Sequence, residues 1–74
     1  MTVHERIRAL REDMEPPMSQ TELGKKLNKT QRAISRLETG ESHLQDVDIV
    51  AYCKLFNVSA DYILCLTDDK QIRV

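Results

Sequence analysis

The sequence predicts an all-α fold in which five helices form one compact unit. Apolar residues recur at spacings of three and four along most of the chain, which is the period of an amphipathic helix. Residues that start or stop helices separate these segments, and no alternation typical of a strand occurs. With 74 residues, the chain has the size of one small domain.

The first helix is predicted to span about three turns, with a charged outer face. Pro16 and Pro17 end it, because proline has no backbone N–H to donate and disfavours helix in the residue before it. The apolar face of this helix consists of Val3, Ile7, Leu10 and Met14.

Two short helices follow, joined by a tight turn. Ser19 and Glu22 form a capping-box pattern, which starts a helix that runs to about Leu27. Asn28 tolerates the left-handed backbone that such a turn requires. Thr30 then offers a hydroxyl that caps the next helix.

The helix after this turn is predicted from about Gln31 to Glu38, and Gly40 ends it in a left-handed conformation. Gly24 stands where the two helices would bring their backbones together. The two helices share one buried side, formed by Leu23, Leu27, Ile34 and Leu37. This arrangement is typical of a helix-turn-helix motif.

Polar side chains occupy the outward face of the second helix of this motif. Carboxamide and guanidinium groups form paired hydrogen bonds with base edges in the major groove of DNA. The sequence therefore predicts base reading by Gln31, Arg32, Ser35 and Arg36.

The net charge of −1 conceals an uneven distribution. Residues 1–36 contain eight Lys or Arg and five Asp or Glu, whereas residues 37–74 contain three and seven. Within residues 20–36 the count is five basic to one acidic. Positive charge is thus concentrated in the segment that carries the helix-turn-helix pattern, as DNA binding requires.

Two further helices are predicted in the second half of the chain. The fourth follows a polar loop at 41–43, and its apolar stripe is Ile49, Tyr52, Cys53 and Phe56, flanked by Val50 and Leu55. Asn57 repeats the left-handed stop, and Ser59 caps a fifth helix. The apolar residues of that fifth helix are Tyr62, Ile63, Leu64 and Leu66.

Several other classes of function are excluded by the pattern. The spacing of His4, His43, Cys53 and Cys65 matches no common metal motif, so we predict no metal and no cofactor. No catalytic triad order, glycine-rich phosphate loop or carboxylate pair is found, so we predict that the chain is not an enzyme. No apolar run could span a bilayer. We expect both cysteines to be reduced and buried in a cytoplasmic protein.

Three motifs together resemble the Cro/CI-repressor family of phages and bacteria, the xenobiotic-response-element type. They are Ser19-Gln20 at the start of the second helix, the segment 34–40 (ISRLETG), and the segment 57–64 (NVSADYIL). The similarity extends from about Ile7 to Asp68, and it implies a five-helix domain of the lambda-repressor-like type with the helix-turn-helix at the second and third helices.

The resemblance also implies roles for individual residues. Gln20 would bind a DNA phosphate and brace Gln31, the first outward residue of the recognition helix. Arg11 and Glu38 would form a structural ion pair between the first helix and the recognition helix. We predict phosphate binding by Gln20, Lys26, Lys29 and Thr30.

Several positions depart from the usual family pattern, among them the extra Pro16-Pro17 in the loop between the first two helices. Asn28 and Asn57 stand where glycine is usual, and Lys29 replaces an apolar residue, so its side chain is expected to face solvent or a phosphate. The loop after Gly40 is often basic in phage repressors, whereas this chain has Glu41.

We therefore predict a sequence-specific, double-stranded DNA-binding transcriptional regulator with the role of a repressor, formed by residues 1–68 with a short tail at 69–74. A homodimer is expected, because one recognition helix covers too few base pairs. The alternative is a protein-interaction module, such as an antitoxin-like or anti-repressor partner. No membrane or small-molecule substrate is predicted. The expected dimer contacts are Tyr62, Leu66, Ile72 and Val74.

Overall fold

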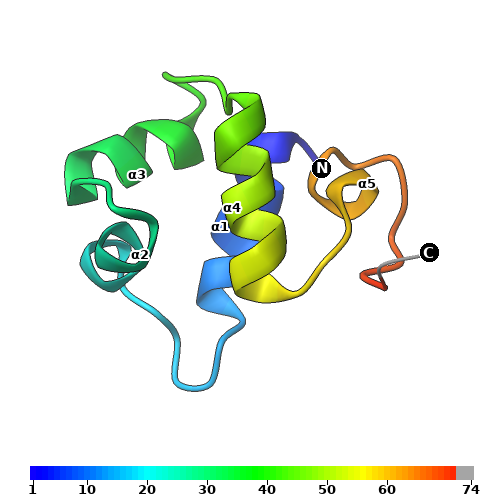
Figure 1. Ribbon diagram of the computed structural model, residues 1–74, viewed down its shortest axis with the longest axis horizontal. Coiled ribbons are helices and arrows are strands. Elements are labelled where there is room, and N and C mark those ends of the chain that lie inside the picture. The colour runs from blue at the N-terminus through cyan, green and yellow to red at the C-terminus, as the bar shows by residue number, and fades with distance from the viewer. Residues whose placement is uncertain (72–74) are drawn as a thin grey trace.

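The computed structural model describes residues 1–71 and contains five helices in that range. In Figure 1, α4 crosses the middle of the molecule with α1 behind it in this view, α2 and α3 lie on one side, and α5 lies on the other. No strand is found within residues 1–71, so the predicted all-α fold is confirmed. The helices are α1 (Val3–Glu12), α2 (Gln20–Leu27), α3 (Gln31–Thr39), α4 (Asp46–Phe56) and α5 (Ala60–Ile63).

Each helix contributes one completely buried side chain to the core. These five residues have no exposed surface, and removing such side chains from water is the main term that holds a small helical domain together. They are Ile7, Leu23, Ile34, Tyr52 and Ile63. The core thus lies where all five helices meet, and the helix-turn-helix is packed onto it through Leu23 and Ile34.

The predicted helix boundaries around the turn are confirmed. Ser19 Oγ accepts a hydrogen bond from the Glu22 backbone N–H at 3.1 Å, and Glu22 Oε1 accepts one from the Ser19 N–H at 3.3 Å. Thr30 Oγ1 accepts from the Ala33 N–H at 3.1 Å. Asn28 adopts the left-handed conformation at φ 58°. Asn57, at φ 55°, ends α4 in the same way.

Gly24 is required by the turn rather than by the crossing of the helix backbones. A Cβ atom at this position would lie 2.5 Å from the carbonyl oxygen of Lys29. The Lys29 backbone N–H also donates to the Gly24 carbonyl at 2.7 Å, so the turn folds directly over this residue. The predicted close approach exists, but its partner is the backbone of the turn.

Three sequence predictions about apolar residues were wrong. The first helix ends at Glu12, so Met14 lies beyond it and is 40% exposed. Helix α5 ends at Ile63, so Leu66 is outside the helix and 74% exposed. The two cysteines are free but only partly buried, not buried as predicted. Val50, which flanks the apolar stripe of α4, is 51% exposed.

Arg6 is an unexpected member of the interior. Its guanidinium carbon lies 4.1 Å from the centre of the Tyr62 ring, and its Nη2 lies 3.2 Å from Asp68 Oδ1. The Ser59 backbone N–H also donates to the Lys70 carbonyl at 3.1 Å, which attaches the start of the predicted tail to α5. Tyr62 therefore takes part in packing within the monomer while staying partly exposed, and its role as a dimer contact stays a prediction.

Within residues 1–71, no helix has the length and hydropathy needed to cross a membrane. The predicted dimer residues Ile72 and Val74 lie outside the described residues.

Candidate nucleic-acid interface

Helix α3 has one buried face and one polar face. Ile34, Leu37 and Glu38 point into the domain, because residues spaced by three and four lie on the same side of a helix. The four predicted base-reading residues come from the rest of the helix. Gln31, Arg32 and Arg36 are exposed, and Ser35 is half-buried.

The predicted ion pair between Arg11 and Glu38 is present and has two hydrogen bonds. Arg11 Nε donates to Glu38 Oε2 at 2.7 Å, and Arg11 Nη2 donates to Glu38 Oε1 at 2.8 Å. Both side chains are largely buried, and the carboxylate raises the pKa of the Arg11 guanidinium despite that burial. Arg11 Nη1 also donates to the Met18 carbonyl, so the pair fixes α1, α3 and the loop before α2 together.

The Glu38 carboxylate also sets the orientation of two glutamines. Gln20 Nε2 donates to Glu38 Oε1 at 3.1 Å, and Gln31 Nε2 donates to Gln20 Oε1 at 2.6 Å. An ionised carboxylate can only accept hydrogen bonds, so the amide of Gln20 must present its nitrogen to Glu38 and its oxygen to Gln31. The expected contact between Gln20 and Gln31 is thus present. The Glu38 carboxylate determines that Gln31 donates and Gln20 accepts in this hydrogen bond.

This chain of hydrogen bonds leaves a defined acceptor at the surface. Because Gln31 uses Nε2 to reach Gln20, its Oε1 has no partner within residues 1–71. A carboxamide oxygen accepts from the exocyclic amine of adenine, and the remaining Nε2 hydrogen can be donated to N7. Gln31 is therefore held in an orientation suited to a base edge.

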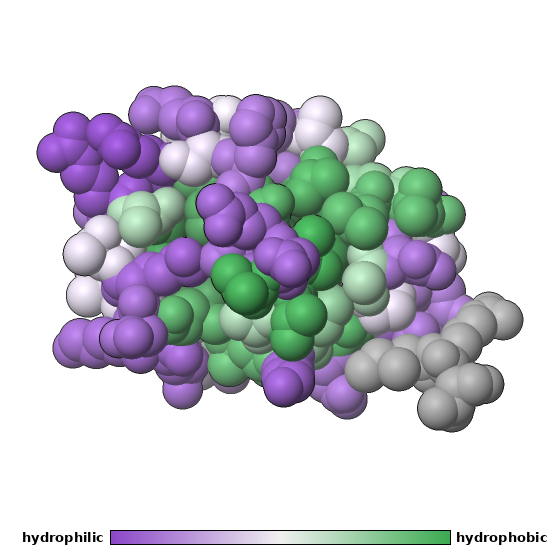
Figure 2. Space-filling model, turned by 45° about the horizontal axis from the view of Figure 1, so that its top comes forward, coloured by the Kyte–Doolittle hydropathy of each residue, from purple (hydrophilic) through white to green (hydrophobic). Residues whose placement is uncertain are grey.

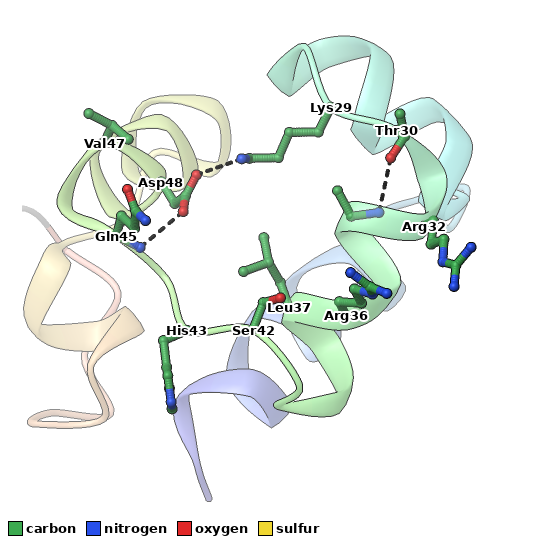
Figure 3. A pocket seen from close by; sticks show the side chains of 11 residues that line it. Lys29, Thr30, Arg32, Arg36, Leu37, Ser42, His43, Gln45, Val47 and Asp48 are labelled. Atoms are coloured by element: carbon green, nitrogen blue, oxygen red, sulfur yellow. Dashed lines mark hydrogen bonds and ion pairs between the residues drawn. The ribbon is translucent and has the colours of Figure 1, made fainter.

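The two arginines of α3 differ in their surroundings. Both line the groove between α3 and the start of α4. Figure 3 shows Arg32 extending from the side of α3 that faces away from α4. Arg32 has no hydrogen-bond or ion-pair partner within the described part of the chain. Arg36 is half exposed, and its Nε lies 3.8 Å from Oε2 of Glu41. Arg32 is accordingly the less restrained of the two.

Lys29 does not face solvent as the sequence predicted. Its Nζ lies 2.8 Å from Asp48 Oδ1, and Figure 3 shows the side chain reaching across from the turn to α4. Asp48 Oδ2 also accepts from the backbone N–H of Gln45 at 2.9 Å. One carboxylate therefore joins the turn of the helix-turn-helix to the start of α4. The structure leaves Lys29 little freedom to reach a phosphate.

The carboxyl group of Asp48 stays ionised in this position. Burial would raise its pKa, but the Lys29 ammonium and the Gln45 N–H outweigh burial and hold the pKa below its usual value. Sequence reasoning missed this pair. Two features of the sequence indicate this ion pair. Lys29 stands at a position that is usually apolar, and Asp48 is the third residue of α4, where it can cap the helix.

The other predicted phosphate-binding residues differ in how far they are exposed. Lys26 is exposed, and Thr30 is exposed at the start of α3. Gln20 is half-buried and already engaged at both ends of its amide. Within residues 1–71, no three His, Cys, Asp or Glu side chains are grouped as a metal site would require. The chemistry that these described residues offer is hydrogen bonding, including the acceptor Oε1 of Gln31, and positive charge.

The fold and this arrangement can be compared with known proteins. The model of the helix-turn-helix family matches residues 7–63, which is most of the chain. The chain is also similar to the P22 c2 repressor protein, solved in complex with synthetic operator 9T in the presence of Tl+. That similarity has 33% identity and a TM-score of 0.76, and it covers 86% of this chain and 94% of the other. No curated protein sequence gives a significant match.

The chain therefore belongs to the helix-turn-helix family, and within it to the phage Cro/CI-like type. The predicted fold class is confirmed by the same similarity, since the solved repressor domain has the lambda-repressor-like helix-turn-helix fold.

A first test concerns Lys29. Replacement by alanine leaves the Asp48 carboxylate buried without its partner, so Lys29→Ala is expected to lower the free energy of unfolding by about 2 kcal/mol. The loss is smaller than for a fully buried pair because water still reaches the lysine. Lys26→Ala removes the same charge from an exposed site and should change stability by less than about 0.5 kcal/mol. Urea unfolding of both variants measures the difference, and equal losses would contradict the assigned role.

Proposed function

We propose that this protein is a sequence-specific, double-stranded DNA-binding transcriptional regulator that inserts α3 in the major groove. The observation that carries the proposal is the outward face of α3, where exposed Arg32 and a braced Gln31 stand side by side on a rigid helix. A major groove admits one α-helix, and these side chains match the hydrogen-bonding groups of adenine and guanine.

The comparison with the P22 c2 repressor supports the same function. That protein was solved bound to a synthetic operator, and its similarity to this chain extends over nearly the whole domain. A repressor role is the natural extension of this similarity. We further propose a cytoplasmic location, because the DNA of a phage or bacterium is found there, and we assign no catalytic residue to the chain.

The proposed contacts divide into two classes. Gln31, Arg32, Ser35 and Arg36 would read bases, while the contacts that position the protein on the backbone carry no sequence information directly. For the latter we propose Gln20, Lys26 and Thr30, which lie at the helix starts and on the exposed side of α2. Lys29 is left out of this set because Asp48 binds its ammonium group.

We also propose that the protein binds DNA as a twofold dimer. Figure 2 shows hydrophobic residues gathered over the middle of the molecule and toward the α5 side, with hydrophilic residues between some of them, whereas hydrophilic groups dominate the α2 and α3 side. Exposed apolar residues include Val50, Leu64 and Leu66. Leu64 also lines an apolar groove of about 400 Å³ together with Ile49 and other residues. A second copy seated here leaves both recognition helices free.

The alternative is a protein-interaction module that uses the same apolar area for a different protein. Such a module has no need for an unpaired arginine and a braced glutamine on the outward face of α3. The two functions are distinguished by whether the protein selects particular sequences from random DNA.

The division between reading and positioning is tested with Arg32 and Lys26. Arg32→Ala should relax the preference at one base position of the site selected from random DNA, at a cost of about 1–3 kcal/mol. Lys26→Ala should weaken binding to all sequences alike and reduce the salt slope by about one unit or less. Fluorescence anisotropy on selected and random duplexes measures both. Equal losses on the two duplexes for Arg32→Ala would rule out base reading by this residue.

Assembly is tested with Leu66. Leu66→Asp places a charge on the proposed contact surface and should prevent two copies from occupying one DNA site, as measured by sedimentation with and without the selected duplex. Because Leu66 is 74% exposed, the fold of the monomer should be preserved. Two recognition helices related by a twofold axis would lie about 34 Å apart and select a near-palindromic site. One copy per site in the wild-type protein would refute the dimer.

A further inference from the structure

Glu41 places a negative charge beside the proposed DNA-reading surface. It follows Gly40, whose left-handed backbone (φ 86°) ends α3 and turns the chain. The Ser42 backbone N–H donates to the Arg36 carbonyl at 3.1 Å, so the residues after α3 are attached to its last turn. Oε2 of Glu41 lies 3.8 Å from Nε of Arg36. Arg36 points outward from α3 (Figure 3), so a carboxylate this close to its guanidinium lies on the same side of the helix.

A carboxylate in this position acts against sequence-independent binding. Attraction between lysine or arginine and phosphates provides nearly all non-specific affinity for DNA. Glu41 opposes that attraction, and two unit charges 4 Å apart in water interact by about 1 kcal/mol, close to a fivefold change in binding. Both Glu41 and Arg36 are at least half exposed, so their pairing adds little to the stability of the fold.

The same carboxylate leaves Arg36 able to read a base. A guanidinium has five N–H donors, and a partner at Nε still leaves the terminal nitrogens free. Those nitrogens can bond to O6 and N7 of guanine in a fixed plane. A phosphate contact needs only the charge, which Glu41 partly neutralises. Pairing with Glu41 therefore weakens the binding of Arg36 to a phosphate more than its hydrogen bonding to a base edge.

We propose that Glu41 is a specificity-determining residue, which directs Arg36 toward base edges and limits binding to random DNA. The inference rests on the proposed function. It differs from the base-reading assignments because Glu41 itself would contact no base. Its effect would be found in the ratio between specific and random affinity.

The experiment compares Glu41→Gln with Asp61→Asn, which makes the same change of charge on α5, away from α3 (Figure 1). Dissociation constants are measured on the duplex selected from random DNA and on a random duplex of equal length, across a range of salt concentrations. Glu41→Gln should bind random DNA about fivefold more tightly and the selected duplex within about twofold of wild type. Asp61→Asn should change neither by more than about twofold.

A second background tests whether Arg36 mediates the effect. In Arg36→Gln, the further change Glu41→Gln should no longer alter the ratio of specific to random affinity. An unchanged ratio for Glu41→Gln, or an altered ratio that persists without Arg36, would overturn the inference. A wild-type protein that selects no sequence at all would instead refute the proposed function, so the two failures are distinguishable.

Discussion

The buried carboxylate of Glu38 is the interaction on which the recognition surface depends. It holds Arg11 of α1 by two hydrogen bonds and, through Gln20, fixes the amide of Gln31 on the outward face of α3. Because a carboxylate only accepts, every hydrogen bond in this chain has a defined direction. Removing a charge of this kind from water is costly, so the pair is better understood as specifying orientation than as a large source of stability.

A second carboxylate has a parallel role at the other end of the motif. Asp48 joins Lys29 in the turn to the start of α4, where an apolar residue would ordinarily pack. Its lowered pKa means that this stabilisation is present at neutral pH and is lost only as acid protonates the carboxyl group in the folded protein. The two buried carboxylates, those of Glu38 and Asp48, thus position α3 relative to its neighbours. The exposed carboxylate of Glu41 partly neutralises the positive charge of Arg36 on α3.

Much of the fold was predictable because its determinants are local. Ser19, Asn28 and Gly40 act through their own backbone or the next turn, and the structure confirms each of them. The errors concern residues whose position depends on distant parts of the chain. Arg6 repeats the spacing of the apolar face of α1, but its burial depends on the Tyr62 ring more than fifty positions later. The partner of Lys29 could likewise be identified only once α4 was packed against the turn.

A double-mutant cycle decides whether Glu38 orients Gln31 for DNA. Arg11→Met/Glu38→Leu replaces the buried pair with apolar groups, which avoids leaving one charge unpaired. Binding of the selected duplex is measured with and without Gln31→Ala in both backgrounds, after circular dichroism confirms that all four proteins are folded. We predict that Gln31→Ala costs at least about 1 kcal/mol less when the pair is absent. Losses that add to within about 0.5 kcal/mol would show that Glu38 does not orient Gln31 for DNA.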